Sequence, residues 1–298
     1  MKLFYSPDYL APGHVETVEK SAWIVDSLAA HPVPGITLVV PPLLAPEALY
    51  RVHGEVYVDA MRTGTPRELA ESQMIPWSPA VFTSALASTS GALAAAREAL
   101  VSGGVSGSLS AGLHHARRTR GAGFCTFNGL ALAAHTALDE GARAVLILDL
   151  DAHCGGGTWS LVAHEPRIRH VDVSVNDFDR WEPDGRSTLD VVDDGSLYLD
   201  RVDAALGALD AEGERFDLCL YNAGVDICNG NPEDPITAET VAAREQKVFA
   251  WCRARGMPTA FVLAGGYIGR TLTREGLVAL HRSTIEAAAG ACLSPTAA

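Results

Sequence analysis

Two carboxylates and an imidazole stand within five residues of this chain, at Asp149, Asp151 and His153. They follow the continuous apolar run 145–148, and three glycines come shortly after them. In an extended segment alternate residues point the same way, so these three side chains are expected on one side of the chain. One imidazole with carboxylates suits a divalent metal such as zinc, although a helix cap beside a surface histidine would have the same sequence.

The elements that must position these residues follow from the apolar pattern. The run 145–148 has no alternation, which is typical of a strand buried on both faces of a parallel sheet. Strands that alternate with helices predict a single α/β domain over 1–298, with three layers made by one parallel sheet flanked by helices. The predicted strands lie at 36–40, shortly before 113, and at 144–149, 168–175, 217–221 and 259–263, and the predicted helices at 78–100, 126–138, 196–211, 237–255 and 271–289.

Polar side chains collect where these strands end. In open parallel sheets ligands bind beyond the carboxyl ends of the strands, so such residues are candidates for one site. Each of them alone could be a helix cap or a turn residue, but their joint appearance at one edge favours a binding or catalytic site. They are His114, His115, Asp149, Asp151, His153, Ser174, Asp226 and Tyr267.

The composition is that of a soluble enzyme. Hydrophobic residues make up 48% and charged residues 20% of the 298 positions. No apolar run reaches the ~18 residues of a transmembrane helix, and the first residues contain no apolar segment of a secretory signal. The six cysteines form no Cys-x-x-Cys pair, so we expect no disulfide framework, no cysteine-rich zinc site, and a cytoplasmic location.

The chain is strongly acidic, with a formal net charge of −13 from 23 basic and 36 acidic residues. That charge repels phosphate backbones and anionic lipid, so nucleic acid and membranes are not expected as partners. It would favour a cationic substrate, although solubility alone also explains an acidic surface. The sequence is compatible with a homo-oligomer.

Five motifs, in order along the chain, resemble those of the histone deacetylase family, which includes acetylpolyamine amidohydrolases and acetoin-utilisation proteins. The resemblance extends from about residue 52 to residue 270. It implies the arginase-type α/β fold of that family and the removal of an acetyl or similar acyl group from an amine. The motifs are Leu113-His114-His115-Ala116, Gly123-Phe124-Cys125-x-x-Asn128, Asp149-Leu150-Asp151-Ala152-His153, Asn222-Ala223-Gly224-Val225-Asp226 and Ala264-Gly265-Gly266-Tyr267.

The resemblance implies one catalytic Zn²⁺, bound by Asp151, His153 and Asp226. Three protein ligands leave a coordination position for a water, whose pKa falls to about 7. His115 would take a proton from this water and later protonate the leaving amine.

Further roles are implied around the zinc. His114 would lie beside the proton-accepting histidine and be oriented by Asp149. Family members also hold a monovalent cation such as K⁺ close to the zinc, which would fall on Asp149, Asp151 and Ser174 here.

The acyl group has its own implied contacts. Tyr267 would donate a hydrogen bond to the substrate carbonyl as negative charge develops on its oxygen. Phe124 would line the tunnel that holds the acylated side chain, and Gly123 and Gly265 would contact the substrate.

Three places depart from the family pattern, and one of them is Ser110-Ala111, which replaces the Pro-Pro that some relatives carry before the histidine pair. Gly156 stands where many members have an Asp or Asn that partners the second histidine of the pair, and Asn176 stands where a His is common. His115 is therefore expected to lack its carboxylate partner, which would leave its imidazolium less stabilised. Tyr267 and the zinc ligands are retained, so we still expect activity.

The expected substrate is a small acylated amine, with acetylpolyamine favoured over acetyl-lysine protein. Polyamine-selective relatives carry a Glu at the position of Glu233, and a carboxylate at the tunnel mouth would attract a cationic chain. A solvent-exposed loop glutamate is the alternative interpretation of this residue.

Two other functions remain open from the sequence. A non-catalytic acyl-amine-binding protein is suggested by Gly156, and a dimanganese ureohydrolase of the arginase type shares the fold. The second chemistry needs extra carboxylates that bridge two ions, and Gly155 and Cys228 stand where those would be expected.

Overall fold

The computed structural model describes residues 1–11, 16–231 and 233–293. Within them, eight strands form one sheet in the order β2-β1-β3-β8-β7-β4-β5-β6, and all neighbouring strands are parallel. The predicted parallel α/β sheet is therefore confirmed. The strands are β1 (Lys2–Phe4), β2 (Thr37–Val39), β3 (Val105–Ser108), β4 (Val145–Asp149), β5 (Ile168–Ser174), β6 (Thr188–Val191), β7 (Leu218–Gly224) and β8 (Thr259–Ala264).

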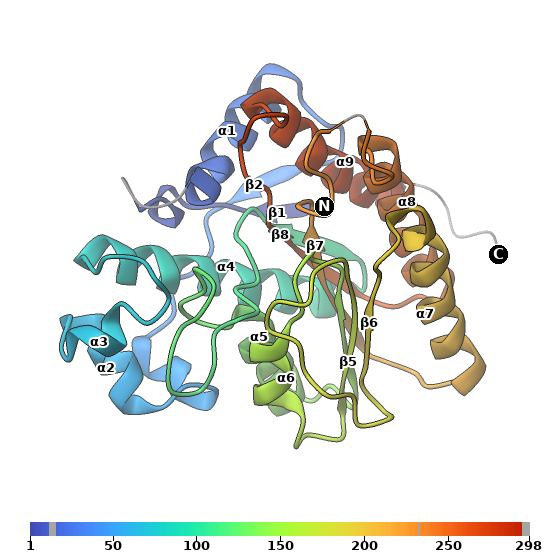
Figure 1. Cartoon of the computed structure of the whole chain (residues 1–298). Helices are drawn as coiled ribbons and strands as arrows, with labels where there is room; N and C mark the ends of the chain where they lie inside the picture. The colour runs from blue at the N-terminus through green and yellow to red at the C-terminus, as the bar shows by residue number, and fades with distance from the viewer. Residues whose placement is uncertain (12–15, 232, 294–298) are drawn as a thin grey trace.

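Helices cover both faces of this sheet (Figure 1). One face packs against α1, α7, α8 and α9, and the other against α2, α4, α5 and α6. None of the helices in the described part of the chain is long and apolar enough to cross a bilayer. The helices are α1 (Glu16–Ala30), α2 (Glu55–Thr63), α3 (Arg67–Ala70), α4 (Pro79–Ser102), α5 (Gly129–Asp139), α6 (Gly156–Val162), α7 (Tyr198–Glu212), α8 (Ala238–Ala254) and α9 (Arg274–Leu293).

The central strand β4 shows why the apolar run has no alternation. Val145 and Ile147 belong to the hydrophobic core on one face, and Leu146 and Leu148 belong to the core on the other. All four side chains are fully buried. Burying a side chain of this size stabilises a fold by roughly 1.5–3 kcal/mol, so β4 anchors both layers and fixes the position of the residues that follow it.

The structure corrects several predicted boundaries. Strands β1 and β6 were not predicted, because β1 has only three residues and β6 is an edge strand without a fully buried residue. The strand expected to end near Leu113 ends at Ser108, and Leu113 itself has a left-handed backbone with φ of +57°. The helix predicted from 126 begins at Gly129, where the Asn128 side chain accepts the Ala131 N–H at its amino end.

Candidate active site

Asp151, His153 and Asp226 converge at the carboxyl edge of the sheet. Asp151 and His153 follow β4, and Asp226 follows the neighbouring strand β7. The Nδ1 atom of His153 lies 3.2 Å from Asp151 Oδ1 and 3.3 Å from Asp226 Oδ2. Ligand atoms around a tetrahedral zinc at its usual bond lengths are about 3.3 Å apart, so these three side chains fit one divalent ion.

The charges in this group also favour a cation. Asp226 Oδ2 is buried, and it faces the Nδ1 atom of His153 at 3.3 Å. Burial and the neighbouring Asp151 raise the pKa of Asp226. Hydrogen bonding to Asp151 and Asp226 raises the pKa of His153 to about 10. Both shifts reflect concentrated negative charge, which a divalent cation would neutralise.

Gly265 allows the loop after β8 to close against this group. Its φ is +61°, and a Cβ atom built on it would lie 2.2 Å from Asp226 Oδ1. Only glycine suits both the left-handed backbone and this close approach. The backbone of Gly265 therefore forms part of the wall of the site, next to the carboxylate of Asp226.

His114 is enclosed by carboxylates. Its Nδ1 donates to Asp149 Oδ2 at 2.8 Å, and its Nε2 lies 3.6 Å from Asp151 Oδ1. Asn222 Nδ2 in turn donates to Asp149 Oδ1 at 2.8 Å and holds that carboxylate in place. Burial alone would lower the pKa of His114, but Asp149 and Asp151 outweigh it and raise the pKa to about 10. Asp149 and Asp151 thus favour the protonated form of the His114 ring.

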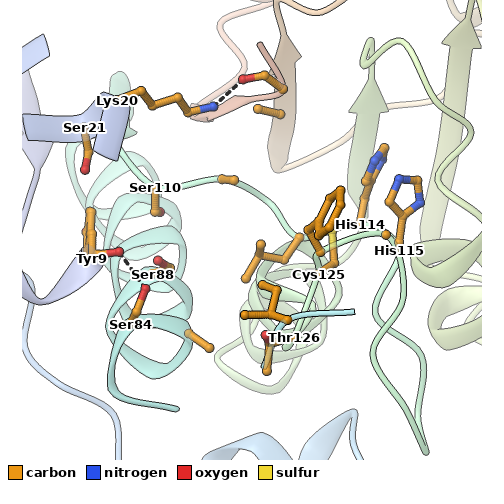
Figure 2. Close-up of a pocket in the computed structure, with 18 of the residues that line it drawn as sticks. Tyr9, Lys20, Ser21, Ser84, Ser88, Ser110, His114, His115, Cys125 and Thr126 are labelled. Carbon is orange, nitrogen blue, oxygen red and sulfur yellow. Dashed lines mark hydrogen bonds between the residues drawn. The ribbon is translucent and has the colours of Figure 1, made fainter. Parts of the chain in front are cut away.

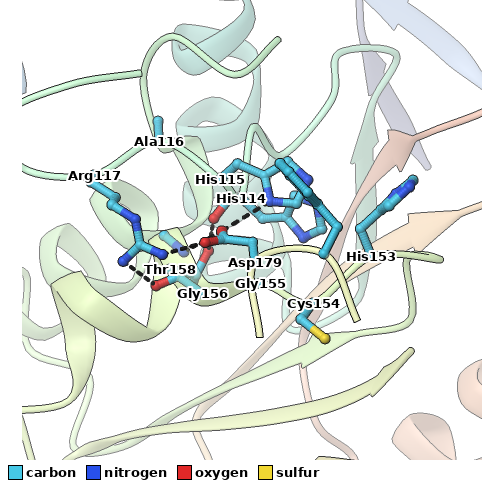
Figure 3. Close-up of polar contacts among 12 residues, drawn as sticks. His114, His115, Ala116, Arg117, His153, Cys154, Gly155, Gly156, Thr158 and Asp179 are labelled. Carbon is cyan, nitrogen blue, oxygen red and sulfur yellow. Dashed lines mark hydrogen bonds and ion pairs between the residues drawn. The ribbon is translucent and has the colours of Figure 1, made fainter. Parts of the chain in front are cut away.

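His115 has a carboxylate partner, so the expectation drawn from Gly156 was wrong. Its Nδ1 donates to Asp179 Oδ2 at 3.0 Å (Figure 3). Asp179 lies in the loop after β5, where no motif pointed to it, although the acidic loop after a predicted strand was a weak signal. The fold thus supplies from a different loop the carboxylate that position 156 lacks.

The surroundings of His115 keep its ring neutral. Burial and the neighbouring His114 lower the pKa of His115 to about 4, and the hydrogen bond to Asp179 only partly opposes them. At neutral pH the Nδ1–H therefore points at Asp179. The Nε2 lone pair is left to accept a proton.

These groups line one cavity, part of which Figure 2 shows. Tyr267 stands at this cavity with 44% of its surface exposed. Burial of the hydroxyl and the charge of Asp226 raise the pKa of Tyr267, so the phenol keeps its proton and can donate a hydrogen bond. The wall includes His114, His115, Gly123, Phe124, Asp151, His153, Asp226, Gly265 and Tyr267.

Two further residues near the group formed by Asp151, His153 and Asp226 were not predicted from the sequence. Lys20 comes from α1, is buried, and donates to the Gly265 carbonyl at 2.6 Å (Figure 2). Burial lowers the pKa of Lys20 to about 8. Phe178 packs edge-on against His115, with ring centroids 5.0 Å apart, and against His153. Lys20 carries no sequence signal, since nothing in its surroundings along the chain resembles a motif.

Glu233 is not brought to the cavity. Its side chain is exposed, and it is not among the described residues that line the wall. Its backbone N–H donates to Asn231 Oδ1, within the same loop, and Pro232 between them lies outside the described residues. A role for Glu233 at the tunnel mouth stays a prediction.

A second buried acidic group lies behind the histidine pair. The donor atoms of Asp149, His170 and Asp172 lie within 4.8 Å of one another, and Ser174 Oγ donates to Asp172. This group shares no residue with the group formed around His153. The described residues therefore offer no carboxylate pair that bridges two ions, which disfavours a dimanganese centre.

Comparison with known proteins decides the family. A model of the histone deacetylase domain matches residues 14–183, which is more than half of the 298 residues. This chain belongs to the histone deacetylase family. The matched region contains the first three of the five motifs, up to His153.

Individual relatives of this histone deacetylase family member cover much of its length. An uncharacterized protein from Picosynechococcus sp. is 33% identical over 281 residues, which cover 88% of this chain and 91% of the relative. Histone deacetylase 2 from Arabidopsis thaliana is 30% identical over 189 residues, which cover 57% of this chain and 49% of that protein.

A solved structure supports the fold. The crystal structure of acetylpolyamine aminohydrolase from Burkholderia pseudomallei aligns with a TM-score of 0.77 at 21% identity, over 96% of this chain and 98% of that chain. At this identity the similarity concerns the fold. The predicted arginase/deacetylase type of α/β fold is confirmed.

Proposed function

We propose that this member of the histone deacetylase family is a zinc-dependent amide hydrolase that removes an acetyl or similar acyl group from a small amine. One observation carries the proposal: His153 Nδ1 lies 3.2 and 3.3 Å from the carboxylates of Asp151 and Asp226, in a cavity shared with the neutral His115. The donor set and its excess negative charge fit a single Zn²⁺, which would polarise the amide carbonyl and acidify a bound water. A K⁺ ion near Asp149 and Ser174 belongs to the same proposal.

His115 would transfer the proton, and His114 would assist through its positive charge. The Nε2 atom of His115 accepts the proton of the attacking water and later returns it to the leaving amine, a role worth roughly 10²–10⁴-fold in rate. Asp179 stabilises the imidazolium that forms in between. His114 stays protonated on Asp149, and its charge helps to keep the pKa of His115 low.

Tyr267 would act on the acyl oxygen. Its hydroxyl keeps its proton, because burial and Asp226 raise its pKa. Donation of this proton into a hydrogen bond favours the transition state, in which negative charge develops on the carbonyl oxygen. The same tyrosine is partly exposed, so it stands where a substrate entering from solvent would first meet the metal group.

A small, positively charged amine fits the rest of the chain best. The net charge of −13 attracts cations, and the aligned Burkholderia structure is of an acetylpolyamine aminohydrolase. Glu233 lies outside the cavity wall, so attraction by the whole acidic surface supports this preference more than a single gatekeeping residue does. The non-catalytic alternative was motivated by Gly156, and Asp179 removes that motive.

Release of free amine from a substrate panel tests this function. We expect purified, zinc-loaded protein to turn over N-acetylputrescine with a kcat/KM ~10-fold above that for an acetyl-lysine peptide, and to lose turnover on chelation. Glu233→Leu is expected to leave this preference unchanged, and a loss of preference would place Glu233 at the substrate after all. Inertness of the zinc-loaded protein toward every acylated amine would contradict the proposal.

A further inference from the structure

We propose that Asp179 is the positioning residue for His115, and that Gly156 is the space in the fold that admits it. The proposal rests on the proposed function, because it assigns the proton transfer to His115. It adds a residue from a loop that no motif includes, and it explains why the chain has no side chain at position 156.

The Asp179 carboxylate is fixed from three directions. Oδ2 accepts the His115 Nδ1–H at 3.0 Å and the Gly157 backbone N–H at 2.9 Å. Oδ1 accepts from the Arg117 guanidinium, which also donates to the Gly156 carbonyl at 3.2 Å (Figure 3). The side chain is only 9% exposed. These three donors fix the orientation of the carboxylate, and with it that of the ring that donates to it.

Gly156 and Asp179 compete for the same space. A Cβ atom built on Gly156 would lie 2.2 Å from the Asp179 carbonyl oxygen and 2.8 Å from its Oδ1. Real Cβ atoms do not approach oxygen so closely, and the carbonyl belongs to the backbone, so it cannot rotate away. A side chain at 156 and the present loop conformation therefore exclude one another.

The loop after β5 is built to hold this position. Asn176 Oδ1 accepts the Phe178 N–H at 2.8 Å, and the Cys154 N–H donates to the Phe178 carbonyl at 3.0 Å. Asp179 follows with a left-handed φ of +60°, which aspartate tolerates better than most residues. Gly156 and Asn176, two of the departures from the family pattern, thus belong to one arrangement that brings a carboxylate to His115.

Asp177 provides a matched control two residues away. It is an exposed carboxylate on the same loop, with no side-chain hydrogen bond or ion pair among the described contacts. Removing its charge changes the loop's net charge as much as removing that of Asp179. A difference between the two variants therefore reports on contact with His115 rather than on charge near the site.

Steady-state kinetics of four zinc-loaded variants test the assignment. We expect Asp179→Asn to lower kcat ~10-fold and Asp179→Ala ~100-fold, with KM and zinc content unchanged and Asp177→Asn equal to the wild type. Gly156→Ala is expected to lower kcat at least ~10-fold, because the added Cβ collides with the Asp179 backbone carbonyl and displaces the loop that holds the carboxylate against the ring. A kcat within ~3-fold of the wild type for Asp179→Ala, or for Gly156→Ala, would overturn the proposal.

A readout without turnover separates this proposal from the proposed function. In protein labelled with ¹⁵N-histidine, the ring signals of His115, assigned by their loss in His115→Gln, are expected to show the Nδ1–H tautomer. In Asp179→Ala the population moves toward the Nε2–H form. An unchanged tautomer would refute the role of Asp179, whereas a wild type that hydrolyses no acylated amine would refute only the function.

Discussion

His114 and His115 are neighbours in sequence, with ring centroids 4.0 Å apart, yet their surroundings hold them in opposite charge states. Burial disfavours the cation in both. His114 faces Asp149 and Asp151, which raise its pKa to about 10. His115 donates to Asp179 and also feels Asp151, but burial and the charge of His114 outweigh both carboxylates and lower its pKa to about 4. The number of nearby charges, not the residue type, divides the pair into a cation and a base.

The largest expected effect is a difference in kcat between substitutions of the two histidines. His115→Gln removes the proton acceptor and should lower kcat ~1,000-fold, whereas His114→Gln removes only a neighbouring cation and should lower it ~10-fold. Initial rates with N-acetylputrescine, at equal zinc content, give both values. Equal losses from the two substitutions would mean that the rings share one role.

A smaller expected effect concerns the pH dependence of the folding stability that each of the two histidines contributes. The folded-state pKa of His115, about 4, lies below the ordinary value of 6.5, so the unfolded chain binds more protons as pH falls and stability is lost between about 6.5 and 4. The pKa of His114, about 10, lies above 6.5, so its stabilisation is complete below pH 6.5 and is lost as pH rises toward 10. The two histidines thus act in opposite directions.

Denaturant unfolding of the metal-free protein from pH 4.5 to 9.5 measures these slopes. Each pKa unit corresponds to about 1.4 kcal/mol at most. His115→Gln should flatten the loss on the acid side, and His114→Gln should flatten the loss on the alkaline side. Identical pH profiles for the two variants would contradict the assigned charge states.

The sequence predicted the central strand, whose side chains are fully buried, but it did not predict the half-exposed edge strand β6. The unbroken apolar run of β4 indicated a strand covered on both faces, and the structure shows such a strand. Strand β6 lies at the sheet edge and keeps its side chains half-exposed, so it carries no comparable pattern. A short edge strand is held by pairing with its neighbour β5, which is a contact that local sequence does not encode.

The residues of the site also divide into those that the sequence predicts and those that depend on tertiary packing. Asp151 and His153 come from one strand end, and position in a parallel sheet was enough to bring Asp226 beside them. Asp179 reaches His115 through a left-handed turn and the space beside a glycine, and both depend on tertiary packing. Lys20 arrives from a helix near the amino end of the chain.

The central claim is that Asp151, His153 and Asp226 hold one catalytic metal ion. Metal content by mass spectrometry, measured together with kcat for the wild type and Asp226→Asn, tests it most directly. We predict one equivalent of zinc in the wild type, and in Asp226→Asn a loss of zinc and of turnover in the same proportion. Full zinc content with normal turnover in Asp226→Asn, or turnover that survives complete chelation, would contradict the account.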